Sequence, residues 1–347
     1  MDKLYRLIRI VTLPVLLLSG GVACAGDITG AGATFPAGAY AKWATTYKTH
    51  DFSVNYQAIG SGAGIKQIVA GIVDFGASDV PMSAEELSAN GLIQFPTLVG
   101  GIVPAVNIAG IGPGQLKLSG DVLADIFLGK ITRWNDPRIA VDNKGLNLPD
   151  LKIVVVYRAD QSGSAFVFTT YLAQVSPDWK RNVGVGSSVR WPAGIGGQGN
   201  EGAASYIHRL QGSIGFVEYA TVMQNKMAYV QLKNRDGQFV SPSQASLKAA
   251  AAYAAWDAAK GFNVSLVNQP GKESWPITTT TFVLLHKMQP STERGQSMLG
   301  FFGRAFREGS QLISDLGYVP LPDNVVKMIH AAWKAEVKDA AGKALWQ

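Results

Sequence analysis

The sequence has almost no cysteine: Cys24 is the only one among 347 residues. A disulfide within the chain needs two cysteines, so the fold cannot be stabilised by one. Stability must therefore come from the packing of apolar side chains. The hydrophobic content of 47% indicates a well-buried globular protein. The length exceeds what one core usually supports, which predicts two domains or lobes.

Charged residues are also scarce, at 16% of the chain, and Lys and Arg form no run. The formal net charge is +6, and it falls to about +4 if the N-terminal segment is removed, because Lys3, Arg6, Arg9 and Asp2 together carry +2. This weak positive balance argues against nucleic acid as a partner.

No long apolar run is present that would span a membrane permanently. The apolar stretch at 10–18 follows a positively charged start and precedes Ala23–Ala25, an A-x-A cleavage pattern. Residues 1–25 are thus predicted to be a cleaved signal peptide, and the mature protein to be periplasmic in a Gram-negative bacterium. Gly21 stands where lipidation of Cys24 would call for a large aliphatic residue, which favours ordinary cleavage.

Against these absences, one polar stretch stands out, at Arg158–Ser164. It follows the β-branched run 153–157 and precedes a segment with apolar residues at helical spacing, so it predicts a strand, a tight loop and a helix start. Helix starts have unpaired N–H groups and a partial positive charge that favour anions. Arg158, Asp160, the hydroxyls of Ser162 and Ser164, and the close backbone approach that Gly163 allows add to that preference. The alternative is an ordinary turn with a capping serine and an Arg–Asp pair.

Two further loops have the same design. Gly30–Pro36 leads into a helix, with Thr34 in the position of an N-cap and the amides of Ala33 and Phe35 beside it. Gly60–Gly64 follows a predicted strand at 54–58 and places Ser61 at a helix start. Asp79 ends another short strand, and a carboxylate beside anion-seeking loops is unusual enough to indicate function.

The remaining segments alternate between strands and helices, which predicts an α/β fold whose ligand lies at the carboxyl ends of the strands. The expected elements are a strand crossing between lobes at 96–108, a separate unit at 109–150 with a helix at 119–128, a glycine-rich loop at 191–202 before a helix capped by Asn200, a strand at 213–222, a helix at 242–256, a strand at 278–285, and helices at 291–308 and 322–338 with Val326, Ile329, Trp333 and Val337 as the buried stripe of the last.

The loops at 30–36, 56–62, 73–79 and 158–164 together resemble those of the periplasmic phosphate-binding proteins of high-affinity phosphate ABC transporters, and the resemblance extends from about residue 28 to the C-terminus. It implies a two-lobed periplasmic-binding-protein fold, each lobe a mixed β-sheet flanked by helices, with the ligand in the interlobe cleft. The implied lobes are 26–107 with 283–347, and 108–282.

Carried over to this sequence, the resemblance implies a monomeric receptor for inorganic phosphate that serves the permease and ATPase subunits of an ABC importer. It implies phosphate contacts from Ala33, Thr34, Phe35, Ser61, Asp79, Arg158, Ser162, Gly163 and Ser164, with Asp160 pairing the arginine. Two positions depart from the family's pattern: Ser164 stands where threonine is common, and Gly62 where a second serine is common.

Two alternatives remain open. The first is a receptor for another tetrahedral oxyanion, such as sulfate. The second is an exported phosphatase, which needs a nucleophile with a base, or metal ligands. The four histidines lie outside the candidate loops and not at metal-ligand spacing, so we expect no metal, no cofactor and no enzymatic activity.

Overall fold

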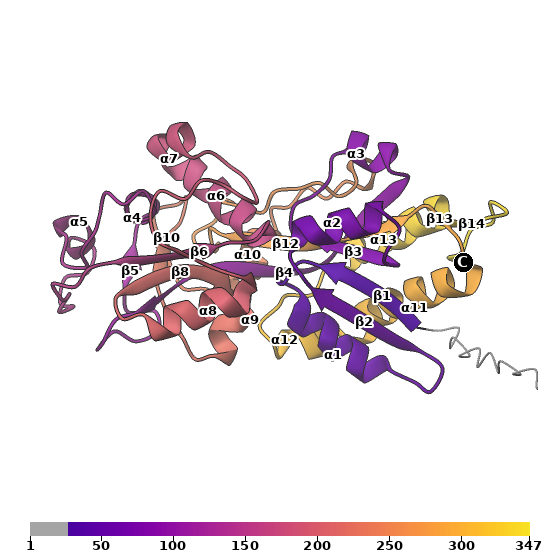
Figure 1. Ribbon diagram of the computed structural model, residues 1–347, viewed down its shortest axis with the longest axis horizontal. Coiled ribbons are helices and arrows are strands. Elements are labelled where there is room, and N and C mark those ends of the chain that lie inside the picture. Colours follow the sequence, from indigo (N-terminus) through magenta and orange to yellow (C-terminus); the bar gives the residue numbers. More distant parts are fainter. Residues whose placement is uncertain (1–26) are drawn as a thin grey trace, which may run out of the picture.

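The protein is described from a computed structural model that places residues 27–347. The predicted signal peptide, with Cys24, lies outside these described residues. Two lobes lie side by side along the longest axis (Figure 1), and β4 (Leu92–Asn107) and β12 (Thr278–His286) run through the centre. Within residues 27–347, no helix combines the length and apolar character that crossing a membrane requires.

The first lobe is built on the strands β2 (Ser53–Ala58), β1 (Asp27–Gly32), β3 (Phe75–Ser78), β12 and the first part of β4, in that order. β1 is parallel to β2 and to β3, whereas β12 is antiparallel to β3 and β4. Its helices and short C-terminal strands are α1 (Ala37–Tyr47), α2 (Ser61–Val69), α3 (Ala84–Ala89), α11 (Thr292–Glu308), α12 (Ser310–Ser314), α13 (Asp323–Glu336), β13 (Met288–Gln289) and β14 (Lys338–Asp339).

The second lobe continues the same sheet through the second part of β4, then β8 (Ser213–Glu218), β6 (Val154–Arg158) and β7 (Ile195–Gly197), with β9 (Ala228–Tyr229) also on β4. A small sheet joins β11 (Phe239–Val240), β10 (Gln231–Lys233) and β5 (Lys117–Leu118). The helices are α4 (Gly120–Phe127), α5 (Pro137–Ala140), α6 (Gly163–Val175), α7 (Pro177–Asn182), α8 (Gly199–Arg209), α9 (Tyr219–Gln224), α10 (Gln244–Ala251) and a 3₁₀ turn (Ala258–Lys260).

Strand β4 connects the two lobes, as its continuous apolar sequence predicts. Leu92–Gly101 pairs with β12, and Ile102–Asn107 pairs with β8, so a single strand serves both lobes. Its pairing with β12 shifts register beside Pro96, which has no N–H to give to the ladder. The α/β two-lobed fold expected from the sequence is confirmed. The lobe boundaries at 107 and 282 stay a prediction, and the second falls inside β12.

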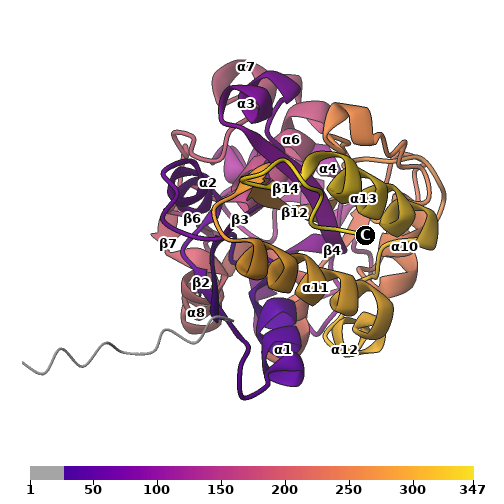
Figure 2. The same ribbon diagram turned by 90° about the vertical axis from the view of Figure 1, so that its right-hand side faces the viewer.

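The C-terminal segment returns to the first lobe. Figure 2 shows α11 beside α1, with α13 beyond α11, although about 250 residues separate α11 from α1 in the chain. The Phe302 ring of α11 packs edge-on against the rings of Tyr40, Phe75 and Phe95 at centroid distances of 6.1, 5.2 and 5.6 Å. In α13 the buried side chains are Val325, Ile329 and Trp333. The predicted stripe was therefore wrong at one position, because it named Val326 where Val325 is the buried residue.

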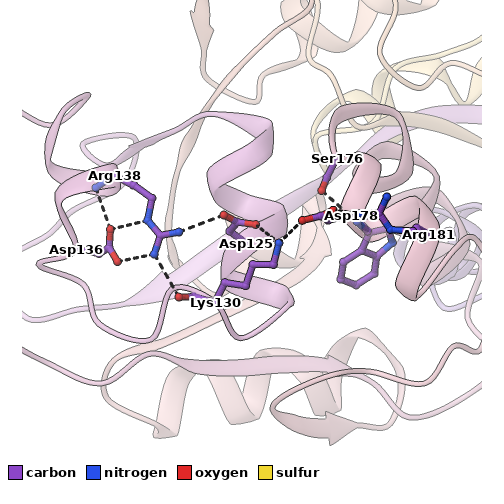
Figure 3. A network of polar contacts seen from close by, with 8 residues as sticks. Asp125, Lys130, Asp136, Arg138, Ser176, Asp178 and Arg181 are labelled. Atoms are coloured by element: carbon purple, nitrogen blue, oxygen red, sulfur yellow. Dashed lines mark hydrogen bonds and ion pairs between the residues drawn. The ribbon is translucent and has the colours of Figure 1, made fainter.

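Residues 109–150 are not a separate unit, contrary to expectation. Leu116, Leu123 and Phe127 belong to the same buried core as the strands of the second lobe. On the surface, a network of ion pairs joins this segment to α7 (Figure 3). Lys130 Nζ lies 2.5 Å from Asp178 Oδ2 and 3.5 Å from Asp125 Oδ1. These side chains are partly exposed, so the network fixes orientation more than it stabilises.

Three other predicted segments differ from the structure in their bounds or in the elements they contain. The strand expected at 213–222 ends at Glu218, where α9 begins. The helix expected at 242–256 covers Gln244–Ala251. The glycine-rich stretch 191–202 contains the short strand β7, which forms because β6 supplies a parallel partner for Ile195–Gly197. Local sequence carries little of that information, since glycine is poor in strands.

We predict that Phe302→Ala lowers the free energy of unfolding by about 3–5 kcal/mol, because it leaves a cavity among packed aromatic rings. Urea unfolding followed by circular dichroism measures this loss. Phe302→Leu should cost less, and Tyr253→Ala, at a side chain that is 53% exposed, should change little. Equal losses for the three variants would contradict the packing described for α11.

Candidate functional site

The three predicted loops and Asp79 converge where the two lobes meet. Ser61, at the start of α2, is the link between them: its Oγ accepts the N–H of Asp79 at 3.3 Å and the N–H of Gly163 at 3.1 Å. The N–H of Gly62 also donates to the carbonyl of Gln161 at 3.1 Å across the same junction. Helices α2 and α6 therefore both direct their N-termini to this place, and α1 begins nearby, which makes the junction favourable for an anion.

The first loop is oriented by a half-buried tyrosine, Tyr56. Tyr56 Oη donates to the carbonyl of Ala33 at 2.6 Å. Because a trans peptide directs its C=O and N–H to opposite sides, the N–H of Thr34 faces away from Tyr56. Thr34 does not cap α1 as expected, since Pro36 holds the N-cap position without a side-chain bond. Instead, the Oγ1 of Thr34 is buried without a hydrogen-bond partner among the described residues.

Arg158 ends β6 as a buried, fully oriented cation. Its Nε and Nη2 donate to the two carboxylate oxygens of Asp160 at 2.9 and 2.6 Å, which confirms the predicted pair. Its Nη1 donates to Asn200 Oδ1 at 3.0 Å. Burial raises the pKa of Asp160, but the hydrogen bond and charge of Arg158 outweigh it, so that the pKa lies below its usual value. The N–H of Gly199 also donates to Asp160, at 3.1 Å.

The start of α6 supplies the hydroxyls of the third loop. Ser162 is the N-cap, and its Oγ accepts the N–H of Ala165 at 3.1 Å. Ser164 Oγ is buried without a partner among the described residues. A Cβ on Gly163 would lie 2.5 Å from both Asp79 Cβ and Ser61 Oγ, so the close approach of the lobes requires glycine there.

Asp79 is the acceptor of the site. Asp79 is the residue that follows β3, and it is 2% exposed. Thr281 Oγ1 donates a hydrogen bond to its Oδ1 at 2.5 Å. Burial raises the pKa of Asp79 to about 7, against the lowering effects of the Thr281 hydrogen bond and the Arg158 charge. Near neutral pH this carboxyl group is therefore present in both the acid and the ionised form.

Asn200 and Thr281 are site residues that the sequence analysis missed. Asn200 was interpreted only as a helix cap, yet the cap of α8 is Gln198, and the Asn200 amide lies against Arg158 with its Nδ2 buried and unpartnered within the described chain. A run of four threonines at 278–281 was the one available signal for Thr281.

A cavity of about 230 Å³ between the lobes is lined by Thr34, Asn200 and Asp160, among others.

The structure thus brings the predicted residues together: Ala33, Thr34, Phe35, Ser61, Asp79, Arg158, Asp160, Ser162, Gly163 and Ser164. They offer helix N-termini, hydroxyls, one guanidinium group and one carboxyl acceptor. Such a set can hold a tetrahedral oxyanion that carries a proton. Among residues 27–347, no group of His, Cys, Asp and Glu side chains has the arrangement of a metal site. Their contact with an anion stays a prediction.

Comparisons with known proteins give the family. A model of the PBP superfamily domain matches residues 20–302. The chain is 54% identical over 93% of its length to the phosphate-binding protein PstS of Pasteurella multocida, covering 94% of that protein. It is 50% identical over 97% of its length to the PstS of Haemophilus influenzae, covering 99% of that protein.

Solved structures agree on the fold. The crystal structure of a phosphate-binding protein from Stenotrophomonas maltophilia superposes with a TM-score of 0.66 over 92% of this chain and 96% of that one, at 20% identity. The level of identity to the curated relatives, over nearly the whole of each chain, is decisive for membership. The chain therefore belongs to the PBP superfamily, in the family of the PstS phosphate-binding proteins.

Proposed function

We propose that this protein binds inorganic phosphate between its lobes and delivers it to a membrane ABC importer. The observation that carries the proposal is a set of three buried polar atoms without partners in the described chain: Thr34 Oγ1, Ser164 Oγ and Asn200 Nδ2. Leaving a buried polar atom unpaired costs roughly 1–3 kcal/mol. Thr34 and Asn200 line the interlobe cavity beside Asp160, and Ser164 lies in the first turn of α6, so a ligand with several oxygens could satisfy all three together.

The contacts that we assign to phosphate follow from these loops. Thr34 and Phe35, with Ala33 adjoining, and Ser61 would contact it from the first lobe, and Ser162, Gly163 and Ser164 from the second, where α6 begins. Arg158 supplies the cation, Asp160 holds its guanidinium group, and Asp79 accepts a hydrogen bond from an O–H of the ligand. The lobes are then 26–107 with 283–347, and 108–282. The set contains no paired nucleophile and base, which supports a binding protein over a phosphatase.

The wider setting is part of the same proposal. Residues 1–25 direct export and are removed, and the mature monomer meets the permease and ATPase subunits of the importer from the periplasm. The named relatives, which are PstS phosphate-binding proteins, support this setting. Titration calorimetry of ligand-free protein against phosphate, arsenate and sulfate tests the binding, and mass spectrometry of the exported protein tests cleavage after Ala25.

Thr34→Val tests the unpaired hydroxyl. The variant keeps the shape of the side chain and removes a buried group that lacks a partner. We therefore expect the ligand-free protein to gain about 1 kcal/mol in free energy of unfolding while phosphate binding weakens by about tenfold. The control is Thr169→Val, because Thr169 Oγ1 is buried but donates to Phe166 and accepts from Gly186. That variant should lose stability and keep its phosphate affinity, and the opposite pattern would remove Thr34 from the site.

Arg158→Ala should weaken phosphate binding by at least about tenfold, since it removes the cation and leaves Asp160 as an unpaired buried charge. Calorimetry measures the dissociation constant, and circular dichroism checks the fold. Arg307→Ala is the matched control, because it changes the net charge equally at a side chain that is 67% exposed. Unchanged affinity in folded Arg158→Ala would place the anion elsewhere.

Asp79 should discriminate phosphate from sulfate. Phosphate near neutral pH has a proton to donate to a carboxylate, whereas sulfate has none and would meet Asp79 as a repelling charge. Because the pKa of Asp79 is about 7, sulfate should compete better as the pH falls below that value and Asp79 becomes able to donate. In Asp79→Asn this pH dependence should vanish and sulfate should bind more tightly, while Asp51→Asn, at an 89% exposed side chain, should behave as wild type. Competition of sulfate with labelled phosphate measures the effect, and equal sulfate affinity in all three proteins would refute it.

A further inference from the structure

A second buried carboxyl group, Glu218, lines the interlobe cavity together with Thr34 and is not one of the expected phosphate contacts. It ends β8, is 6% exposed, and accepts a hydrogen bond on Oε1 from Thr221 Oγ1 at 2.9 Å. Its Oε2 lies 3.2 Å from Tyr318 Oη, and the same Tyr318 Oη lies 2.7 Å from the carbonyl oxygen of Phe35. Glu218, Tyr318 and Phe35 thus form a chain that leads from the second lobe to the phosphate loop.

The number of protons available to this hydrogen-bonded series indicates whether Glu218 is neutral or ionised. The tyrosine hydroxyl has one proton, and the carbonyl of Phe35 can only accept. The shorter contact, at 2.7 Å, therefore takes the tyrosine proton. The contact between Tyr318 Oη and Glu218 Oε2 joins two oxygen atoms and requires a proton of its own, which a neutral carboxylic acid supplies. An ionised Glu218 would compete for the tyrosine proton and leave the buried carbonyl of Phe35 without a donor.

We propose that Glu218 is a positioning residue for phosphate: held as a neutral acid, it donates to Tyr318, which in turn donates to Phe35 and fixes the Thr34–Phe35 loop. The inference rests on the proposed phosphate site. With Tyr56 on the carbonyl of Ala33 and Tyr318 on that of Phe35, a tyrosine hydroxyl holds the loop at each side of Thr34. Of these two tyrosines, only Tyr318 has a hydroxyl within hydrogen-bond distance of a carboxyl group, that of Glu218.

The surroundings of Glu218 favour the neutral form. Burial raises its pKa well above the ordinary value and is the largest effect, the contacts with Thr221 and Tyr318 act against it, and the charges of Asp79 and Glu201 add to it. Burial and the charge of Glu218 also raise the pKa of Tyr318, so its phenol keeps its proton. The titratable groups that act on Glu218 are thus Tyr318, Asp79 of the β3 end and Glu201 of α8, and Glu218 in turn acts on Tyr56 of β2. A bound phosphate adds negative charge and strengthens the preference.

The sign of the pH effect follows. A carboxyl group that must be neutral in the bound state favours binding at low pH, and this contribution is lost as the pH rises through its raised pKa. Glu218→Gln provides the comparison, because an amide can donate to Tyr318 and accept from Thr221 as the neutral acid does, but cannot titrate. The ratio of the two dissociation constants cancels the titration of phosphate itself, which both proteins share.

The experiment is calorimetry of phosphate binding to wild type and Glu218→Gln from about pH 5.5 to about pH 9.5, a range that extends well above the ordinary pKa of a carboxyl group. We expect equal affinities within about threefold at the acidic end, and a loss of at least about tenfold for wild type relative to Glu218→Gln at the alkaline end. A ratio that does not change with pH would overturn the inference. Absence of phosphate binding to wild type at every pH would instead refute the proposed function.

Tyr318→Phe provides the second measurement, and it also serves if Glu218→Gln does not fold. Without the hydroxyl, the link from Glu218 to Phe35 is cut, so we expect phosphate affinity at acidic pH to fall to the level that wild type reaches at alkaline pH. Adding Glu218→Gln to this variant should then leave the pH profile unchanged. Wild-type affinity in folded Tyr318→Phe, or a pH-dependent effect of Glu218→Gln in its background, would show that Glu218 does not act through Tyr318.

Discussion

The structure depends on one ion pair that is almost entirely removed from water. Arg158 and Asp160 have side chains that are 1% and 7% exposed, and a buried charge is tolerated only when it is paired and hydrogen-bonded. The pair satisfies that requirement within the second lobe, through two bonds between the side chains and further bonds to Asn200 and Gly199. Because its formal charges cancel, the junction of the lobes does not present a strong positive field. An anion there has to be held by directed hydrogen bonds more than by net charge.

This constraint accounts for two carboxyl groups close to a site that would hold an anion. Asp79 and Glu218 are both buried, and burial raises the pKa of each, so neither needs to be a fixed negative charge. A carboxyl group whose proton is shared with its surroundings can accept from a protonated ligand or donate to a tyrosine, according to its neighbours. In the roles proposed for them, Asp79 would distinguish ligands by whether they bring a proton, and Glu218 would fix the loop that offers Thr34 and Phe35.

The sequence predicted the parts of this site that depend on local pattern. An alternating strand before a glycine-rich turn placed Ser61 at a helix start. A β-branched run before the loop and an apolar helical stripe after it did the same for Gly163, and the Arg158–Asp160 pair lies within that loop. Asn200, Thr281 and Glu218 could not be found in this way, because each acts through a partner at least 40 residues away in the chain. Strand β7 escaped notice for the same reason, since only pairing with β6 makes its glycine-rich sequence extended. Thr34 shows the converse error: a hydroxyl before a helix suggested a cap, but the backbone geometry gave that position to Pro36.

Gly163 shows how closely the two lobes approach at the site. A side chain at this helix start would meet Asp79 and Ser61 of the first lobe at 2.5 Å, so the close approach, rather than the backbone conformation, requires glycine. The same approach lets Ser61 Oγ accept one N–H from each lobe. A hydroxyl oxygen that accepts two bonds has its own proton left to donate, and donation outward to an oxyanion keeps both bonds, of which the one from Gly163 joins the lobes. Binding of an anion at Ser61 would thus strengthen the contact between the lobes without replacing any part of it, which is the energetic condition for a ligand to favour the closed arrangement.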